Sequence, residues 1–271
     1  MGKKINLYII TEYRYTDIGG SGTRIATWEK ALKIEGCSTK VIVASYYNNK
    51  LPKILEILIN SLYKLVVIFP IFFKLKKGDT AYFYGSFELF WIPFFLKIKG
   101  IKIVFENNEF PRFLAHKKSL VFFIRYQFSI LSMKSGKYLV TCSSALSDFY
   151  SMKTNIKEIF IMPLILDASI FEYDSINNKQ EIGYCGYMGH NKDGIHDLIK
   201  AFEIVHRSFP DWKLRLIGDA DEKTLTSINK LIIKHNLQNS VIMTGKVKHK
   251  KVLELIREAS ILALARPNNK Q

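Results

Sequence analysis

Residues 182–202 read IGYCGYMGHNKDGIHDLIKAF, and they contain a short apolar strand, a glycine-rich loop and the beginning of a helix. The predicted strand covers residues 182–187, and the predicted helix covers residues 195–208. A strand that is followed so soon by a helix is the repeating unit of a parallel sheet covered by helices on both faces. This stretch therefore predicts an α/β fold.

The same alternation of strands and helices runs through the rest of the chain. Further strands are expected at residues 5–11, 39–44, 80–84, 101–105, 138–141, 159–162, 213–217, 240–244 and 261–265. Further helices are expected at residues 23–35, 51–73, 87–97, 118–133, 144–152, 222–234 and 250–258. Gly36 and Gly100 are expected to end helices in the left-handed conformation, and Ser86 and Ser143 are expected to begin them.

A polar segment at residues 172–180 divides the chain into two parts. We expect an N-terminal Rossmann-like domain at residues 1–172 and a second Rossmann-like domain at residues 181–271. The second part has only four predicted strands and three predicted helices. Because a doubly wound domain normally needs more helices to cover such a sheet, we expect the second domain to be incomplete.

Composition and charge narrow the class of protein. The 271 residues are 48% hydrophobic and 24% charged, which excludes intrinsic disorder, collagen-like repeats and a small disulfide scaffold. The net charge of +16 predicts an anionic partner. Basic residues are scattered and no nucleic-acid module is recognisable, so nucleic acid is not the expected partner. The cysteines, Cys37, Cys142 and Cys185, form neither a zinc pair nor a disulfide framework, which favours the cytoplasm.

Residues 54–73 are the one stretch long enough to be considered as a membrane span. Glu56, Lys64 and Pro70 interrupt it, and charges at the centre of a bilayer are costly. A buried helix pair and a helix lying on the membrane surface are the two better interpretations. Residues 1–180 carry 25 basic and 14 acidic side chains, a net charge of +11. We therefore expect peripheral attachment to an anionic membrane surface, at the inner face of the cell membrane.

Gly19-Gly20-Ser21-Gly22 lies between the first strand and its helix. Glycines let a ligand approach the backbone, and the free N–H groups of a helix start attract phosphate. The spacing is not that of the dinucleotide fingerprint, because eight residues separate Thr11 from Gly20. A plain flexible turn explains these four residues equally well.

The loop at residues 186–194 is a second candidate anion site. Lys192 supplies a positive charge at the start of a helix, and His190 is able to donate to a phosphate. Alternatively, Asn191 or Asp193 only caps the helix and Lys192 is solvated. Because no cluster of His and Cys has zinc-ligand spacing, we expect no metal and no other cofactor.

Polar residues also follow two other predicted strands, at the edge where open α/β sheets bind ligands. Arg266 has a guanidinium that can clamp a diphosphate, although a surface arginine is the commoner case at a strand end. Glu106 and Glu109 can meet sugar hydroxyls or take a proton, or they form a polar turn before Pro111.

Together these segments resemble the retaining family 4 glycosyltransferases of the GT-B fold, the glycosyl transferases group 1. The likeness is strongest to bacterial enzymes of surface-polysaccharide assembly, and it covers nearly the whole chain through the order and spacing of short motifs. The motifs are GGSG at 19–22 with Arg24, TCSS at 141–144, MPLILD at 162–167 with Phe171, YCGYM at 184–188, NKDG at 191–194, LIKAF at 198–202, LRLIGD at 214–219, TG at 244–245 and ARP at 265–267.

The resemblance implies two Rossmann-like domains that face each other across a cleft and bind a nucleotide-sugar donor. Lys192 and Arg266 would be the catalytic cations that stabilise the leaving diphosphate, with no metal required. The other implied roles are donor diphosphate binding by Gly20, Ser21, Gly22, Gly186 and His190, contact with the base by Gly218 and Gly245, and acceptor contacts by Glu106 and Glu109.

One departure from the family concerns the end of the chain. The family carries a pair of glutamates, for the donor ribose and donor sugar, just beyond the position of residue 271. We therefore expect a hexosyl-type transferase that is truncated before this acidic pair, acting on a lipid-linked or oligosaccharide acceptor. A non-catalytic remnant that retains acceptor or membrane binding is the alternative. An NAD-dependent sugar-nucleotide enzyme is disfavoured, because the fingerprint spacing and a Tyr-x-x-x-Lys pair in suitable context are absent.

Overall fold

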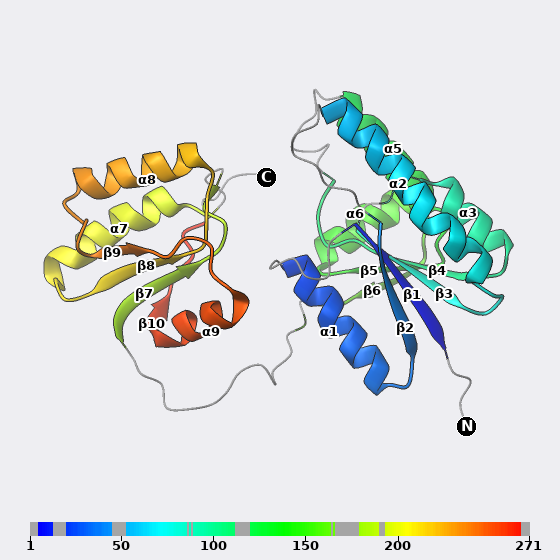
Figure 1. Cartoon of the computed structure of the whole chain (residues 1–271), viewed down its shortest axis with the longest axis horizontal. Coiled ribbons are helices and arrows are strands. Elements are labelled where there is room, and N and C mark those ends of the chain that lie inside the picture. Colours follow the sequence, from blue (N-terminus) through cyan, green and yellow to red (C-terminus); the bar gives the residue numbers. More distant parts are fainter. Residues whose placement is uncertain are drawn as a thin grey trace. The chain divides into compact units, whose positions relative to one another are not determined.

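The structure is a computed structural model, and it describes residues 5–12, 20–44, 53–85, 87, 89–111, 120–163, 165, 179–189 and 193–266. The chain forms two compact units, Met1–Asp167 and Ala168–Gln271 (Figure 1). This division lies slightly before residue 172, where the first domain was predicted to end. Each unit has its own parallel sheet and its own hydrophobic core.

The first unit is built on a six-stranded sheet with the strand order β2-β1-β3-β4-β5-β6. All neighbouring strands are parallel, and the register places Ile9 of β1 between Val41 of β2 and Tyr82 of β3. The carboxyl ends of all these strands therefore lie at one edge of the sheet. The strands are β1 (Asn6–Thr11), β2 (Ser38–Val43), β3 (Thr80–Tyr84), β4 (Lys102–Glu106), β5 (Tyr138–Thr141) and β6 (Glu158–Ile161).

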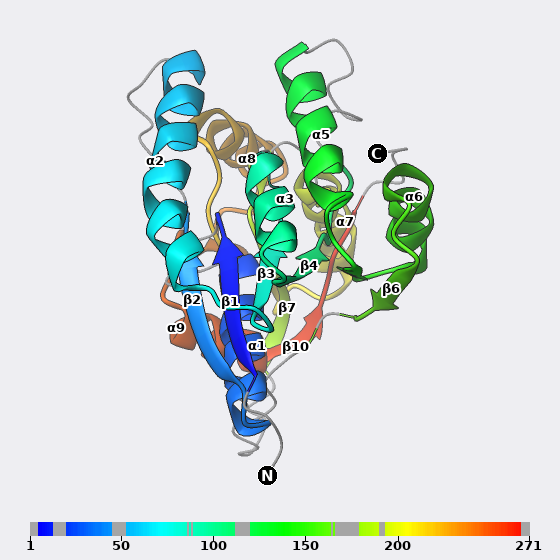
Figure 2. The same cartoon turned by 90° about the vertical axis from the view of Figure 1, so that its right-hand side faces the viewer.

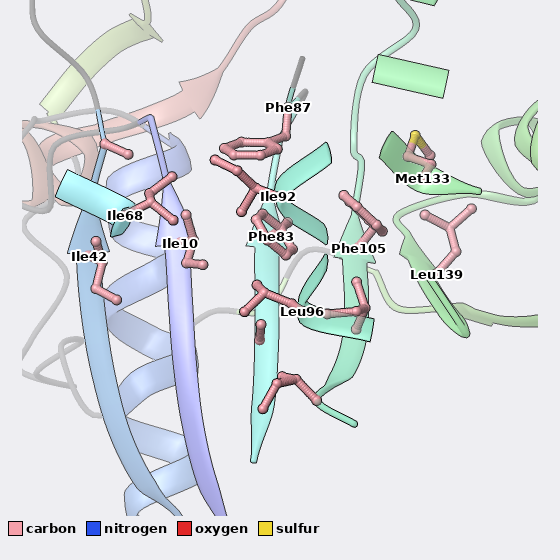
Figure 3. Close-up of a cluster of buried hydrophobic side chains, with 14 of the residues drawn as sticks. Ile10, Ile42, Ile68, Phe83, Phe87, Ile92, Leu96, Phe105, Met133 and Leu139 are labelled. Atoms are coloured by element: carbon pink, nitrogen blue, oxygen red, sulfur yellow. The ribbon is translucent and has the colours of Figure 1, made fainter. Parts of the chain in front are cut away.

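Helices cover both faces of this sheet. On one face α1 (Gly20–Ile34) packs through Ile25 against the alternate side chains of β1. The larger core lies on the other face, where Phe83 and Phe105 stack with their ring centroids 5.1 Å apart (Figure 3). The helices that contribute to this core are α2 (Lys53–Lys74), α3 (Trp91–Ile98), α5 (Leu120–Met133) and α6 (Ser144–Thr154). Figure 2 shows α2, α3 and α5 next to one another on this face.

The predicted helix ends are confirmed where the structure describes them. Gly36 and Gly100 have φ angles of +79° and +81°, the left-handed conformation expected of helix-ending glycines. The hydroxyl of Ser143 accepts a hydrogen bond from the backbone N–H of Leu146, as expected of an N-cap. Ser86 lies outside the described residues.

Of the two interpretations of residues 54–73, the buried helix pair is wrong, and the single helix predicted at residues 51–73 is confirmed. One helix, α2, covers Lys53–Lys74 and includes Pro70. Lys64 of this helix is buried and forms an ion pair with Glu12. Within the parts of the chain that the structure describes, no helix has the length and apolar character needed to cross a membrane.

The second unit has a four-stranded parallel sheet with the order β10-β7-β8-β9. Helices α7 (Ile195–Ser208) and α8 (Glu222–Lys234) pack together, and α9 (His249–Glu258) contacts β7 and β10. Figure 1 shows α9 on the opposite face of the sheet from α7 and α8. The strands are β7 (Lys179–Cys185), β8 (Lys213–Ile217), β9 (Val241–Met243) and β10 (Ala259–Leu262). The predicted α/β class, with two units of parallel sheet, is confirmed.

Candidate functional site

The carboxyl edge of the second sheet brings several predicted site residues together. Gly186 follows β7, Gly218 follows β8, and Gly245 follows β9. The N–H of Gly186 donates to the carbonyl of Ile217 at 3.0 Å, and Gly218 forms an isolated bridge with Gly245. The segments that follow β7, β8 and β9 are therefore joined by backbone contacts at the edge where such sheets bind ligands.

Gly218 has to be glycine for its backbone to pack against that of Gly186. Its φ is +137°, and a Cβ at this position would lie 1.9 Å from the carbonyl oxygen of Gly186. Side chains rarely adopt such a conformation, and none fits in the space. The backbone that follows β8 therefore lies directly against the backbone that follows β7.

Gly186 and Gly245 differ in what surrounds them. A Cβ on Gly186 would lie 2.5 Å from the hydroxyl of Tyr184, so this glycine makes room for the phenol. Gly245 has a φ of +63°, and a Cβ there would meet no atom within 4 Å. The backbone of Gly245 consequently borders open space, where a flat ligand group can approach it.

Asp193 connects two other side chains at this edge. One carboxylate oxygen accepts a hydrogen bond of 2.8 Å from the hydroxyl of Tyr184, and the other accepts one of 3.1 Å from the guanidinium of Arg266. Burial and the bond to Asp193 raise the pKa of Tyr184, so the phenol stays protonated and keeps donating. The guanidinium of Arg266 remains largely exposed, and Asp193 limits the directions in which it can point.

The suggestion that Asp193 caps helix α7 is not supported. The N-cap of α7 is Gly194, in the left-handed conformation and without a side-chain hydrogen bond, while Asp193 turns toward Tyr184 and Arg266. Asn191, Lys192 and His190 lie outside the described residues, immediately before Asp193. Their predicted roles at the diphosphate stay predictions.

The glycine-rich segment of the first unit is part of a helix. Gly20, Ser21 and Gly22 form the first turn of α1, which begins three residues earlier than the predicted residue 23. Ser21 forms a hydrogen bond with Tyr84 at the end of β3, although burial raises the pKa of this phenol overall. The segment is therefore attached to the carboxyl edge of the first sheet.

Glu106 is fully buried and bound within the first unit. Its carboxylate forms an ion pair with Arg24 at 2.5 Å and accepts hydrogen bonds from Tyr82 and Asn108. Burial and Glu106 together raise the pKa of Tyr82 well above its usual value, so this phenol is neutral. Both oxygens of Glu106 are thus occupied by protein groups, which leaves the exposed Glu109 as the predicted acceptor-side carboxylate that solvent reaches.

Arg24 is the site residue whose role sequence reasoning missed. Its guanidinium also donates to the carbonyl oxygens of Pro163 and Met162, at 3.0 Å and 3.2 Å. Arg24 therefore ties the start of α1 to β4 and to the chain that leaves β6. The available signal was an arginine two residues after GGSG combined with a glutamate that directly follows a predicted buried strand.

The described residues hold no group of three or more His, Cys, Asp or Glu side chains that is able to bind a metal ion. The charged groups at the carboxyl edge of the second sheet include the Asp193–Arg266 pair and the exposed Asp219 after Gly218, and the predicted Lys192 directly precedes Asp193 in the chain. Such an edge suits an anionic ligand that is held by a guanidinium and backbone N–H groups.

Two α/β units with parallel sheets define a protein of the GT-B fold, and solved glycosyltransferase structures share it. Sucrose-phosphate synthase from Thermosynechococcus elongatus matches with a TM-score of 0.71 and 12% identity, over 96% of this chain and 75% of that chain. A glycosyltransferase from Rickettsia africae matches with a TM-score of 0.63 and 17% identity, over 98% of this chain and 74% of that chain. Anabaena HepE in complex with UDP and glucose matches with a TM-score of 0.63 and 12% identity, over 96% of this chain and 74% of that chain.

The sequence comparison concerns the second unit. Residues 167–267 match the family model described as Glycosyl transferases group 1. The match extends over nearly all of the second unit, and the candidate edge from Gly186 to Arg266 lies inside the matched residues. Among curated proteins, no sequence matches the chain at a significant level.

Proposed function

We propose that this protein is a retaining, hexosyl-type glycosyltransferase, which transfers a sugar from a nucleotide-sugar donor to a lipid-linked or oligosaccharide acceptor. The match of the second unit to the glycosyl transferases group 1 and the GT-B fold support the class of reaction. The Anabaena neighbour was solved with UDP and glucose, and a starch synthase from Arabidopsis thaliana was solved with ADP. A sugar attached to a nucleoside diphosphate is the donor that fits this class.

The observation that supports the proposal most strongly is the arrangement of Arg266 and Asp193 beside the glycines that follow the strands of the second sheet. Asp193 holds an exposed guanidinium at the edge where Gly218 and Gly245 leave the sheet. Lys192 precedes Asp193 in the chain, so a second cation belongs to the same loop. Two cations beside open backbone suit a diphosphate, and the free space at Gly245 suits a nucleotide base.

The chemistry requires charge stabilisation more than a nucleophile from the protein. The hydroxyl oxygen of the acceptor replaces the diphosphate oxygen on the anomeric carbon, and the diphosphate leaves with the electron pair of the broken bond. The proton of the acceptor hydroxyl passes to the leaving diphosphate oxygen. Arg266 stabilises the negative charge that develops on this leaving group, because Asp193 holds it before the reaction begins, and we assign to Lys192 the second positive charge. Tyr184 supports Arg266 indirectly by fixing the carboxylate of Asp193.

The first unit contributes the acceptor side. In this unit the first turn of α1, with Gly20, Ser21 and Gly22, has backbone N–H groups that suit an anionic ligand, and Arg24 with Glu106 holds this turn on the sheet. We assign the acceptor to the cytoplasmic synthesis of a bacterial surface polysaccharide, at the inner face of the cell membrane. The net charge of +11 on residues 1–180 supports an anionic membrane as a partner.

Replacement of Lys192 by alanine tests the proposal. The variant should lower turnover roughly 100-fold, the scale for the loss of one preorganised charge stabiliser. Release of nucleoside diphosphate from UDP-, ADP- and GDP-sugars measures this turnover. Lys200→Ala is the matched control, because Lys200 is an exposed lysine of α7 that pairs with Asp197. Full turnover in Lys192→Ala would remove this residue from the site.

A further inference from the structure

Helix α2 presents apolar side chains to solvent as well as to the core. Ile68, Ile71 and other buried side chains face the sheet. On the opposite side Val66 and Phe69 are 70% and 62% exposed, and Leu62 and Phe73 continue the same stripe with exposures of 62% and 65%. An ordinary surface helix has a polar outer face, so this second apolar stripe is unusual.

Helices α3 and α5 extend this apolar surface. Phe94 and Ile98 of α3 are exposed, and so are Leu120 and Ile124 of α5. The two helices pack against each other, with the rings of Phe90 and Phe128 5.6 Å apart. Lys99, directly after α3, lies over the ring of Phe72 in α2, so the α3 segment contacts both α2 and α5. Figure 2 shows the three helices side by side, and we name their exposed side chains the apolar helix face.

The charges around the apolar helix face are positive. Lys74, Lys76, Lys77 and Lys97 are exposed at the ends of α2 and α3. Among the described side chains of residues 59–102, the one carboxylate is Asp79, which is buried and bound to Asn6. Helix α5 contains no acidic residue. The surface therefore combines large apolar side chains with lysines and with no exposed carboxylate among these described residues.

We propose that the apolar helix face docks on the surface of an anionic lipid bilayer. The aliphatic and aromatic side chains enter the boundary between headgroups and acyl chains, while the lysines contact lipid phosphates. A second copy of this chain is a poorer partner, because a symmetric contact would bring the same lysines together. The inference names the surface for the membrane partner proposed above, and its test does not depend on sugar transfer.

Co-sedimentation with vesicles tests the apolar contribution. The chain should sediment with phosphatidylcholine vesicles that contain phosphatidylglycerol, and much less with phosphatidylcholine alone or at high salt. The double variant Val66→Ser/Phe69→Ser should bind at least about tenfold more weakly, because it removes most of two inserted side chains. The matched control is Ile204→Ser/Ile233→Ser, two similarly exposed residues of the second unit, which should bind as the wild type does.

The lysines and the depth of insertion are tested separately. Lys76→Gln/Lys77→Gln should weaken binding to the anionic vesicles about tenfold or more without affecting the fold. Trp91 lies on α3 and is partly exposed, so its fluorescence should shift to the blue on anionic vesicles, and Trp91→Phe should remove the shift.

Four results would overturn the inference. They are absence of binding at low salt, equal binding to neutral and anionic vesicles, unchanged binding by the Val66→Ser/Phe69→Ser variant, and a dimer in analytical ultracentrifugation that this variant abolishes. Loss of sugar transfer with intact vesicle binding would contradict the proposed reaction and leave the docking surface in place.

Discussion

Gly218 gives a sharp test of how the carboxyl edge of the second sheet is built. Its φ of +137° would cost a residue with a side chain about 1–3 kcal/mol. A Cβ there would also lie 1.9 Å from the carbonyl oxygen of Gly186, and forcing two packed segments apart costs about 1–3 kcal/mol more. Gly218→Ala should therefore lower the free energy of unfolding of the second unit by about 2–6 kcal/mol, a large share of a domain's usual ~5–15 kcal/mol.

Gly245→Ala separates this packing effect from ligand binding. The φ of +63° costs an alanine about 1–2 kcal/mol, but the new methyl group would meet no atom within 4 Å. Because we propose that the nucleotide base lies beside Gly245, this variant should weaken nucleotide binding more than it weakens folding. Gly36→Ala is the control in the first unit, since Gly36 has a φ of +79° and equally open surroundings. It should leave nucleotide binding unchanged.

Urea unfolding followed by tryptophan fluorescence measures the effect. Trp212 packs against the core of the second unit, so a Trp28→Phe/Trp91→Phe background reports on that unit alone. The reasoning is refuted if Gly218→Ala unfolds within about 0.5 kcal/mol of the parent, which is the scatter of ordinary surface substitutions. A loss in Gly245→Ala as large as that in Gly218→Ala would refute it too.

Glu106→Gln should lower the free energy of unfolding of the first unit by about 3–5 kcal/mol, because it leaves the buried positive charge of Arg24 without an opposite charge. Urea unfolding measures this change, and an unchanged midpoint would contradict the buried ion pair. The pKa of Tyr184 is raised on folding, so its neutral phenol contributes stability below about pH 10 that is lost as the pH rises through the folded-state pKa. Tyr184→Phe should therefore remove one late-titrating phenol from an absorbance titration, and an unchanged curve would show that Tyr184 ionises normally. Asp193→Asn should lower kcat more than it raises KM for the donor, since Arg266 keeps its charge but is no longer held for the charge that develops on the leaving diphosphate; an effect on KM alone would argue against this positioning role.

The regular elements with the clearest local pattern were predictable from the sequence. The structure reproduces the predicted bounds of β3, β5, α7, β8 and α8 because apolar side chains recur at strand or helix spacing between clear turns. Helix α2 was predicted at residues 51–73, close to its observed bounds, although a proline inside a helix costs about 3 kcal/mol by propensity alone. Burial of Ile68 and Ile71 on the two sides of Pro70 outweighs that cost, and only the folded core reveals it.

The contacts that organise the candidate site were not predictable in the same way. The sequence indicated Arg266, Glu106, Gly218 and Gly245, because each follows a predicted strand at the ligand-binding edge. It gave no sign that Arg24 pairs with Glu106 or that Arg266 pairs with Asp193, since these partners lie 82 and 73 residues apart. Such pairs depend on which strands become neighbours in the sheet, and local patterns do not contain that information.

Calorimetric titration with nucleoside diphosphates tests whether the protein has a donor site. At least one of UDP, ADP and GDP should bind, and the corresponding nucleoside without phosphates should bind at least about tenfold more weakly, the scale of a charge-assisted hydrogen bond. Replacing both Lys192 and Arg266 by alanine should abolish this preference for the diphosphate. Binding of no nucleoside diphosphate, or equal affinity for diphosphate and nucleoside, would contradict the proposed donor site.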